Sequence, residues 1–157
     1  MYPRRLAHVG MTVPDVDEAV EWYCETLGFD LIGAPETFTP DDDHAGPMLA
    51  DILGTFEELR AAHLQTSGGV AVEFLSFADT DERADLSSHR AGWAHLCVVD
   101  EDVAGLAARI DAAGGDHCAD VHTVVPGDPY ELTYCRDPFG NRIEIFSHSD
   151  ERTFSNR

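Results

Sequence analysis

The sequence is poor in basic residues. It has 10 lysine and arginine residues against 30 aspartate and glutamate residues, which gives a formal net charge of −20 at pH 7. Phosphate groups would repel such a chain, so the composition argues against a nucleic acid or an anionic membrane as a partner. Although acidic proteins also occur in ordinary cells, an excess of this size suggests a cytoplasm of high ionic strength, where salt screens the self-repulsion.

Cysteines are also few, and a long apolar segment is missing. The four cysteines, Cys24, Cys97, Cys118 and Cys135, form no C-x-x-C pair and lie in or beside apolar segments, so we expect reduced core residues. The first residues, MYPRRLAHVG, lead from two arginines directly into a short strand-like run, which predicts neither a signal peptide nor a membrane span. We therefore expect a cytoplasmic protein, folded as a single domain over residues 1–157.

Two similar segments lie 87 residues apart in the chain. HVGMTVPDVDEAVEWYCETLGF begins at His8, HLCVVDEDVAGLAARIDAAGGD begins at His95, and the same offset carries Asp15 to Asp102. In each copy, an apolar strand holding the histidine leads to an aspartate at a helix N-cap and then to a helix that ends near glycine. The repeat therefore predicts two modules of the same fold.

Apolar residues recur at helical spacing in both copies, which predicts amphipathic helices packed on a sheet. They are Val16, Val20, Tyr23 and Leu27 in the first copy, and Val103, Ala107 and Ile110 in the second. After each helix the chain returns to strand-like runs: FDLIG, RAAHLQT and VAVEFLSF in the first copy, and a run around VHTVV, YELTYC and NRIEIF in the second. Each module is thus β-α-β-β-β, and the predicted fold class is α+β.

The two modules differ in length. We expect module one over about residues 5–78 and module two over about residues 91–148, with the surplus of module one in an insertion at about 34–59. A cluster of Pro, Asp and Gly in that insertion precedes a short apolar run, which predicts a loop followed by a short helix. The insertion would serve either as a lid over a pocket or as a surface elaboration.

Four polar residues stand between apolar neighbours at equivalent strand positions of the two modules: His8 and Glu73, and His95 and Glu144. A lone carboxylate within a sheet is costly unless a cationic group meets it, although Glu144 alone would also fit a solvated strand face. If a pseudo-twofold axis relates the modules, the four side chains converge. Two imidazoles and two carboxylates form a site suited to Ni, Zn, Co, Mn or Fe.

The chain resembles the vicinal oxygen chelate superfamily, which includes glyoxalase I, methylmalonyl-CoA epimerase, extradiol dioxygenases, fosfomycin-resistance enzymes and bleomycin-binding proteins. The resemblance runs from about His8 to Ser147 outside the insertion, and its most specific pieces are HVGMTVPDVDEAVEWYCETLGF and YCRDPFGNRIEIF. It implies paired β-α-β-β-β modules whose curved mixed sheets form a metal-centred cleft. It also implies a homodimer, in which half of the ligands often come from each chain.

The ligand pattern is most similar to that of glyoxalase I, whose ligands follow the order His, Glu, His, Glu. The resemblance therefore implies that His8, Glu73, His95 and Glu144 bind a divalent metal and that Glu144 is also the catalytic base. A metal on the substrate oxygens makes the neighbouring C–H more acidic, and a glutamate can carry the proton between carbons. The implied activity is that of a lyase or isomerase acting next to a carbonyl of a small substrate. Methylmalonyl-CoA epimerase commonly has glutamine second, and bleomycin binders lack the ligands.

The sequence leaves more than one substrate class in consideration. Bacterial glyoxalases that use glutathione carry an arginine and an asparagine four residues after the first and second ligands, where this chain has Thr12 and Phe77. A different conjugate or an unconjugated hydroxy-carbonyl compound fits as well, and we identify no substrate-binding residues from the sequence.

Two alternative functions also fit the sequence. An Fe(II) extradiol dioxygenase needs only two histidines and the last glutamate, and such enzymes place an active-site tyrosine where this chain has Tyr134, ten residues before Glu144. A binding protein without chemistry could line a pocket with Trp22, Trp93, Phe77 and Phe146. The other histidines are His44, His63, His89, His117, His122 and His148, of which His63 alone is a candidate accessory acid.

Overall fold

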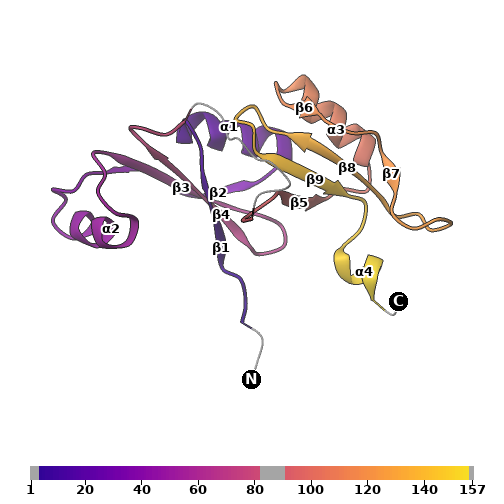
Figure 1. Ribbon diagram of the computed structural model, residues 1–157, viewed down its shortest axis with the longest axis horizontal. Helices are drawn as coiled ribbons and strands as arrows, with labels where there is room; N and C mark the ends of the chain where they lie inside the picture. Colours follow the sequence, from indigo (N-terminus) through magenta and orange to yellow (C-terminus); the bar gives the residue numbers. More distant parts are fainter. Residues whose placement is uncertain (1–3, 82–90, 156–157) are drawn as a thin grey trace. The chain divides into compact units, whose positions relative to one another are not determined.

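The computed structural model describes residues 4–81 and 91–155, so His89 lies outside the described residues. The chain divides into two compact units, Met1–Glu82 and Arg83–Arg157, each of which is described by itself (Figure 1). Each unit contains one mixed sheet, which confirms the predicted α+β class with two mixed sheets. Within the described ranges, no helix is both long and apolar enough to cross a membrane. The single-domain organisation and the cytoplasmic location stay predictions.

Unit 1 is a four-stranded sheet with two helices. Its elements are β1 (His8–Thr12), α1 (Val16–Leu27), β2 (Asp30–Phe38), α2 (Ala45–Leu53), β3 (Leu59–Gln65) and β4 (Ala71–Phe77). The strands lie in the order β1-β4-β3-β2, with β1 parallel to β4 and the other neighbours antiparallel. This is the β-α-β-β-β order expected for module one, with α2 inserted between β2 and β3.

The capping signals position α1 as the sequence predicts. The Asp15 carboxylate accepts a hydrogen bond from the Glu18 backbone N–H at 3.0 Å, and Gly28 ends the helix with φ of 70°. The apolar face of α1 is buried, and the Tyr23 ring lies 4.8 Å from the Phe74 ring on β4. The helix therefore covers one face of the sheet and leaves the other face available for polar side chains.

The insertion begins later than expected. Strand β2 continues to Phe38 because it pairs with β3 as far as the register Phe38↔Leu59, so residues 34–38 belong to the sheet. The expected short helix is α2, which leaves Met48 and Ile52 exposed. Its apolar run is therefore largely on the surface of unit 1.

Unit 2 repeats the pattern with shorter strands. Its elements are β5 (Leu96–Val99), α3 (Val103–Ala112), β6 (Asp116–His117), β7 (His122–Thr123), β8 (Glu131–Arg136), β9 (Arg142–Phe146) and α4 (Asp150–Phe154). The strand order is β5-β9-β8-β6, with β7 also paired to β8 and β5 parallel to β9. Helix α3 starts at the expected cap, where the Asp102 carboxylate accepts from the Gly105 N–H at 2.9 Å.

Two sequence-based expectations for unit 2 were wrong in detail. The strand expected around VHTVV is only the two-residue β7, because the chain turns soon after it, where the Asp128 N–H donates to the Val125 carbonyl at 3.1 Å. Before β7 the chain leaves the ladder, and there the Thr133 hydroxyl donates to the Ala119 carbonyl at 2.6 Å. Cys135 is buried as expected, whereas Cys97 and Cys118 are exposed. Cys97 lies on the edge strand β5, and Cys118 follows β6, so neither reaches the core.

Candidate functional site

In unit 1, His8 and Glu73 face each other across the parallel strands β1 and β4. The partner of Glu73 in the register is Gly10, which has no side chain, and a Cβ at that position would lie 3.7 Å from Glu73 Oε2. His8 Nε2 lies 3.7 Å from Glu73 Oε2. The first predicted pair is thus together.

His63 is a third member of this group. It stands directly opposite Glu73 in the antiparallel pair of β3 and β4, and its Nε2 lies 3.2 Å from Glu73 Oε1. The rings of His8 and His63 meet edge to face, with centroids 6.0 Å apart. Gly33 on β2 leaves space for the imidazole, since a Cβ there would lie 3.2 Å from the Cβ of His63. Each carboxylate oxygen of Glu73 therefore faces a different histidine.

In unit 2, His95 and Glu144 form the second predicted pair. His95 directly precedes β5, and its Nε2 lies 3.0 Å from Oε2 of Glu144 on β9. The Glu144 side chain is 13% exposed, against 26% for Glu73. The sheet partner of Glu144 on β5 is Cys97, another small residue at the position equivalent to Gly10.

Tyr134 occupies the place in unit 2 that His63 occupies in unit 1. It stands opposite Glu144 in the antiparallel pair of β8 and β9, and its ring meets the His95 ring edge to face at 5.4 Å. Burial and a hydrogen bond to Glu144 raise the pKa of the Tyr134 hydroxyl to about 12, while the positive charge of Arg142 opposes the rise. The hydroxyl is therefore a proton donor to Glu144 at neutral pH.

The histidine, the glutamate and the third residue of unit 1 all have counterparts at equivalent repeat positions in unit 2. Both His63 and Tyr134 precede their glutamate by ten residues, and both contact the glutamate and the histidine of their own unit. A comparison of the repeats that looks for identical residue types misses this pair, because one member is histidine and the other is tyrosine. The equal spacing was the signal that could have found it.

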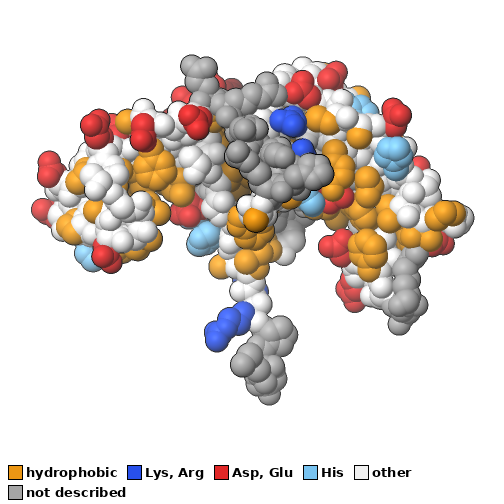
Figure 2. Space-filling view, in the orientation of Figure 1, with side chains coloured by type: hydrophobic (Ala, Val, Ile, Leu, Met, Phe, Trp, Pro, Cys, Tyr) orange, Lys and Arg blue, Asp and Glu red, His pale blue; other side chains and the backbone are white. Residues whose placement is uncertain are grey.

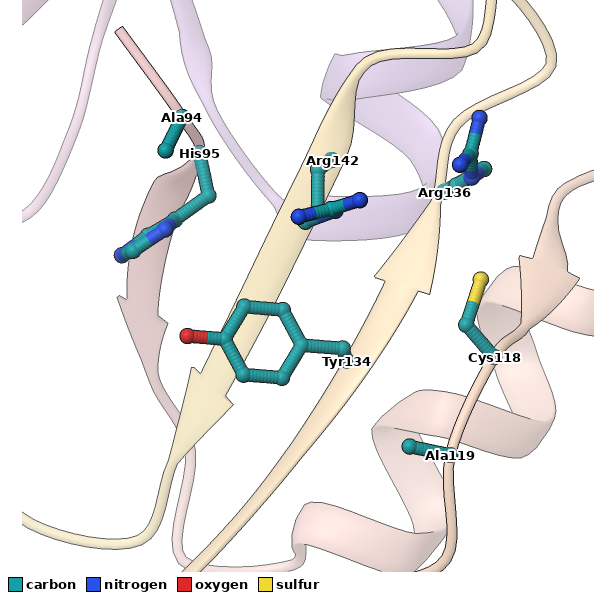
Figure 3. A pocket seen from close by; sticks show the side chains of 7 residues that line it. All are labelled: Ala94, His95, Cys118, Ala119, Tyr134, Arg136 and Arg142. Carbon is teal, nitrogen blue, oxygen red and sulfur yellow. The ribbon is translucent and has the colours of Figure 1, made fainter. Parts of the chain in front are cut away.

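A cavity of about 570 Å³ lies beside His95 in unit 2 (Figure 3). Besides His95 it is lined by Ala94, Cys118, Ala119, Tyr134, Arg136 and Arg142. This volume lies within the range of small-molecule sites in proteins. The second group therefore adjoins a space in which a small ligand fits.

The donor sets suit a divalent metal. Each pair offers one imidazole nitrogen and one carboxylate oxygen, the donors that Zn and related ions accept. With bonds of about 2.1 Å, two neighbouring ligands of one ion lie about 3 Å apart, close to the separation in the His95–Glu144 pair. Within the described ranges, no three His, Cys, Asp or Glu side chains are gathered to hold a metal. The four-ligand site therefore stays a prediction.

Three comparisons relate the chain to known proteins. Residues 5–145 match the family model of the glyoxalase/bleomycin resistance protein/dioxygenase superfamily. A 2-epi-5-epi-valiolone epimerase from Actinomyces sp. is 29% identical over 154 residues, which cover 89% of this chain and 77% of that protein. A glyoxalase family protein from Bacillus cereus has a similar fold, with a TM-score of 0.76, 20% identity and coverage of 93% of this chain and 95% of the other.

Two further solved structures share the fold. Glyoxalase I from Zea mays has a TM-score of 0.66 at 22% identity, over 93% of this chain and 45% of that one. A mutant of the fosfomycin resistance protein FosX from Listeria monocytogenes, solved with Mn(II) and 1S,2S-dihydroxypropylphosphonic acid, has a TM-score of 0.62 at 13% identity, over 98% of both chains. At these identities the likeness establishes the fold.

Proposed function

Because the chain belongs to the glyoxalase/bleomycin resistance protein/dioxygenase superfamily, we propose that it is a metal-dependent enzyme of the glyoxalase or epimerase kind. It would transfer a proton at a carbon next to a carbonyl of a small substrate. The observation that carries this proposal is the presence of a His–Glu pair at equivalent places in both units, His8 with Glu73 and His95 with Glu144.

The four residues would hold one divalent ion, Ni, Zn, Co, Mn or Fe, within one chain or between two chains. Such an ion polarises a carbonyl group and makes the neighbouring C–H more acidic. Glu144 is the proposed base, since its carboxylate is fixed by His95 and by the Tyr134 hydroxyl beside the cavity. Glu73, which lies between His8 and His63, is its proposed partner on the opposite face.

The comparisons support the isomerase side of this proposal. The relative that is 29% identical is an epimerase, and a reversible proton transfer at carbon is one way to invert a stereocentre. Glyoxalase I and a Mn(II)-containing FosX share the fold. A metal-dependent reaction on a small molecule is consistent with all three.

One observation favours a second candidate, the Fe(II) extradiol-type dioxygenase. Tyr134 contacts both His95 and Glu144 beside the cavity, which is where a tyrosine could meet a substrate bound next to iron. The fourth donor, Glu73, argues against it, because dioxygen chemistry on a two-His, one-carboxylate face needs open positions. The dioxygenase therefore serves as the competing outcome of the test.

The test is anaerobic incubation with hydroxy-carbonyl and thiol-conjugated compounds in deuterated water, using Ni, Zn, Mn and Fe forms of the protein. We expect solvent deuterium at the carbon next to the carbonyl, lost in Glu144→Gln and kept in the control Glu131→Gln, whose side chain is exposed on β8. Metal analysis of protein purified without chelators should show bound metal that His8→Ala loses. Turnover that requires oxygen and Fe(II) would instead assign the protein to the dioxygenases.

We also propose a homodimer. Strands β1 and β5, which carry or adjoin the predicted histidine ligands, lie at sheet edges, and Trp93 and Val99 on or near β5 are exposed. A second copy of the chain would cover such an edge. Light scattering should give twice the chain mass of 17.2 kDa. A monomer with full metal content would reject a site shared between chains.

A further inference from the structure

Two arginines stand directly opposite each other in unit 2. Arg136 on β8 and Arg142 on β9 are sheet partners in the antiparallel pair. Like charges at opposed positions destabilise a sheet. The arrangement is notable in this chain, which has no lysine and only ten arginines against 30 acidic residues. Asp and Glu side chains, coloured red, are spread over the visible surface of both units, whereas basic side chains, coloured blue, are few (Figure 2).

Strand alternation places both arginines on the face of the sheet that carries the predicted site. Tyr134 and Glu144 are the next opposed pair on that face, two residues along each strand. The intervening residues Cys135 and Ile143 point the other way and are fully buried. Arg136 and Arg142 therefore line the same cavity as His95 and Tyr134 (Figure 3).

The surroundings of Arg136 differ from those of an arginine in a structural ion pair. Arg60 in unit 1 has such a pair, since its guanidinium donates to both carboxylate oxygens of Asp17, in one case at 2.7 Å. For Arg136, the described residues provide no side-chain hydrogen bond or ion pair. The Arg136 guanidinium is half-buried at the cavity wall. It is therefore available to bind an anionic group of a ligand, although carboxylates are abundant in the chain.

We propose that Arg136 and Arg142 bind an anionic group of the substrate, a phosphate or carboxylate carried by a small hydroxy-carbonyl compound. This inference rests on the proposed function and names the substrate class of the same site. The planar guanidinium can donate two parallel hydrogen bonds to either anion, and two guanidiniums together offset its charge. The carbonyl end of the compound would lie at His95, Tyr134 and Glu144, and the anionic end two residues along the strands at the arginines.

Calorimetric binding to metal-free protein tests the anion site by itself. The probes are three hydroxymethyl ketones: dihydroxyacetone, which is neutral, dihydroxyacetone phosphate, and 5-hydroxy-4-oxopentanoate, which carries a carboxylate. We expect at least one anionic probe to bind roughly tenfold or more tightly than dihydroxyacetone, because hydrogen bonds to charged groups are the stronger ones. The tighter of the two anionic probes identifies phosphate or carboxylate as the preferred group.

Substitutions test whether the two arginines cause the tighter binding of the anionic probe. Arg136→Gln and Arg142→Gln should each weaken the anionic probe by roughly tenfold to a hundredfold and leave dihydroxyacetone unchanged. Arg136→Lys, which keeps the charge but not the planar fork, should lose less than Arg136→Gln. Arg152→Gln on α4 is the matched control, because it removes one exposed positive charge away from the cavity. Circular dichroism establishes that each variant is folded.

The outcomes separate this inference from the proposed function. Equal binding of all three probes, or anion binding that survives both glutamine substitutions, would overturn the anion site. If the metal-loaded protein exchanges deuterium into neutral and anionic ketones at equal rates, and the arginine variants do so too, the anion site is also rejected while the proposed function stands. Arginine-dependent anion binding without any exchange supports the anion site and removes the proton-transfer function.

Discussion

Replacing Asp137 by alanine should destabilise unit 2 strongly, because this residue closes the turn that aligns β8 with β9. The carboxylate of Asp137 is fully buried. One of its oxygens accepts from the Asn141 backbone N–H at 2.7 Å, and the other accepts from Asn141 Nδ2 at 2.8 Å. The Asp137 N–H donates to the Asn141 carbonyl at 3.0 Å, so the two residues hold the turn from both sides.

The magnitude follows from the two donors that Asp137→Ala would leave without an acceptor. Asn141 is only 6% exposed, so water does not readily replace the lost carboxylate. An unsatisfied buried donor costs about 1 to 3 kcal/mol, which gives roughly 2 to 6 kcal/mol for both. That is a large part of the free energy of unfolding of a typical domain, which is about 5 to 15 kcal/mol. Asp137→Asn keeps one acceptor oxygen and should lose about half as much.

Urea unfolding followed by circular dichroism measures the effect. Asp120→Ala is the control, because the Asp120 side chain is exposed and its carbonyl, which accepts from the Thr133 hydroxyl, is kept. A loss of less than about 1 kcal/mol in Asp137→Ala would refute the reasoning, since it would mean that the turn holds without the carboxylate. We also expect the variant to weaken metal binding, because the turn sets the register that places Tyr134 opposite Glu144.

Three further predictions concern unit 1. His63→Ala should lower the affinity for Mn(II) or Zn(II) by roughly 10 to 100-fold in a chelator competition, with partial recovery in His63→Gln, because His63 orients the Glu73 carboxylate. Gly10→Val should lower the metal affinity, since its Cβ would touch Glu73 Oε2 and its methyl groups would crowd that oxygen. An unchanged affinity would contradict this expectation. Arg60 lowers the pKa of Asp17, so the ion pair stabilises the fold above pH 3.8 and the benefit is lost as the pH falls through the lowered value. The thermal midpoint of Arg60→Gln should therefore be slightly lower than that of the parent at pH 7, and the difference should disappear in acid.

The sequence was sufficient for the elements that depend on local signals. The caps at Asp15 and Asp102 use side chains three residues from their partners, so the helix starts could be predicted from the sequence. The end of β2 could not, because it depends on pairing with β3 and on two register shifts in that pair. The interrupted strand between β6 and β7 likewise depends on Thr133, a distant residue along the chain.

The candidate site likewise contains some residues that the sequence could identify and others that it could not. His8, Glu73, His95 and Glu144 could be selected because identical residue types recur at equivalent places in two repeats. The third members could not be matched in this way, because the register of an antiparallel pair, and not residue identity, places His63 and Tyr134 opposite the glutamates. The cavity arginines were missed for a similar reason, since their opposition depends on the turn at Asp137.

The differences between the two groups bear on which glutamate is the base. Glu73 lies between two imidazoles and beside Gly10, an arrangement in which each carboxylate oxygen faces an imidazole nitrogen. Glu144 has one imidazole, and a tyrosine hydroxyl replaces the second. It is also less exposed, and its two contacts, His95 and Tyr134, line the same cavity as the arginines. A base must lie within reach of the carbon that loses its proton, and the cavity is the place where a small substrate fits. The asymmetry of the repeats therefore supports the proposal of Glu144, and not Glu73, as the main base.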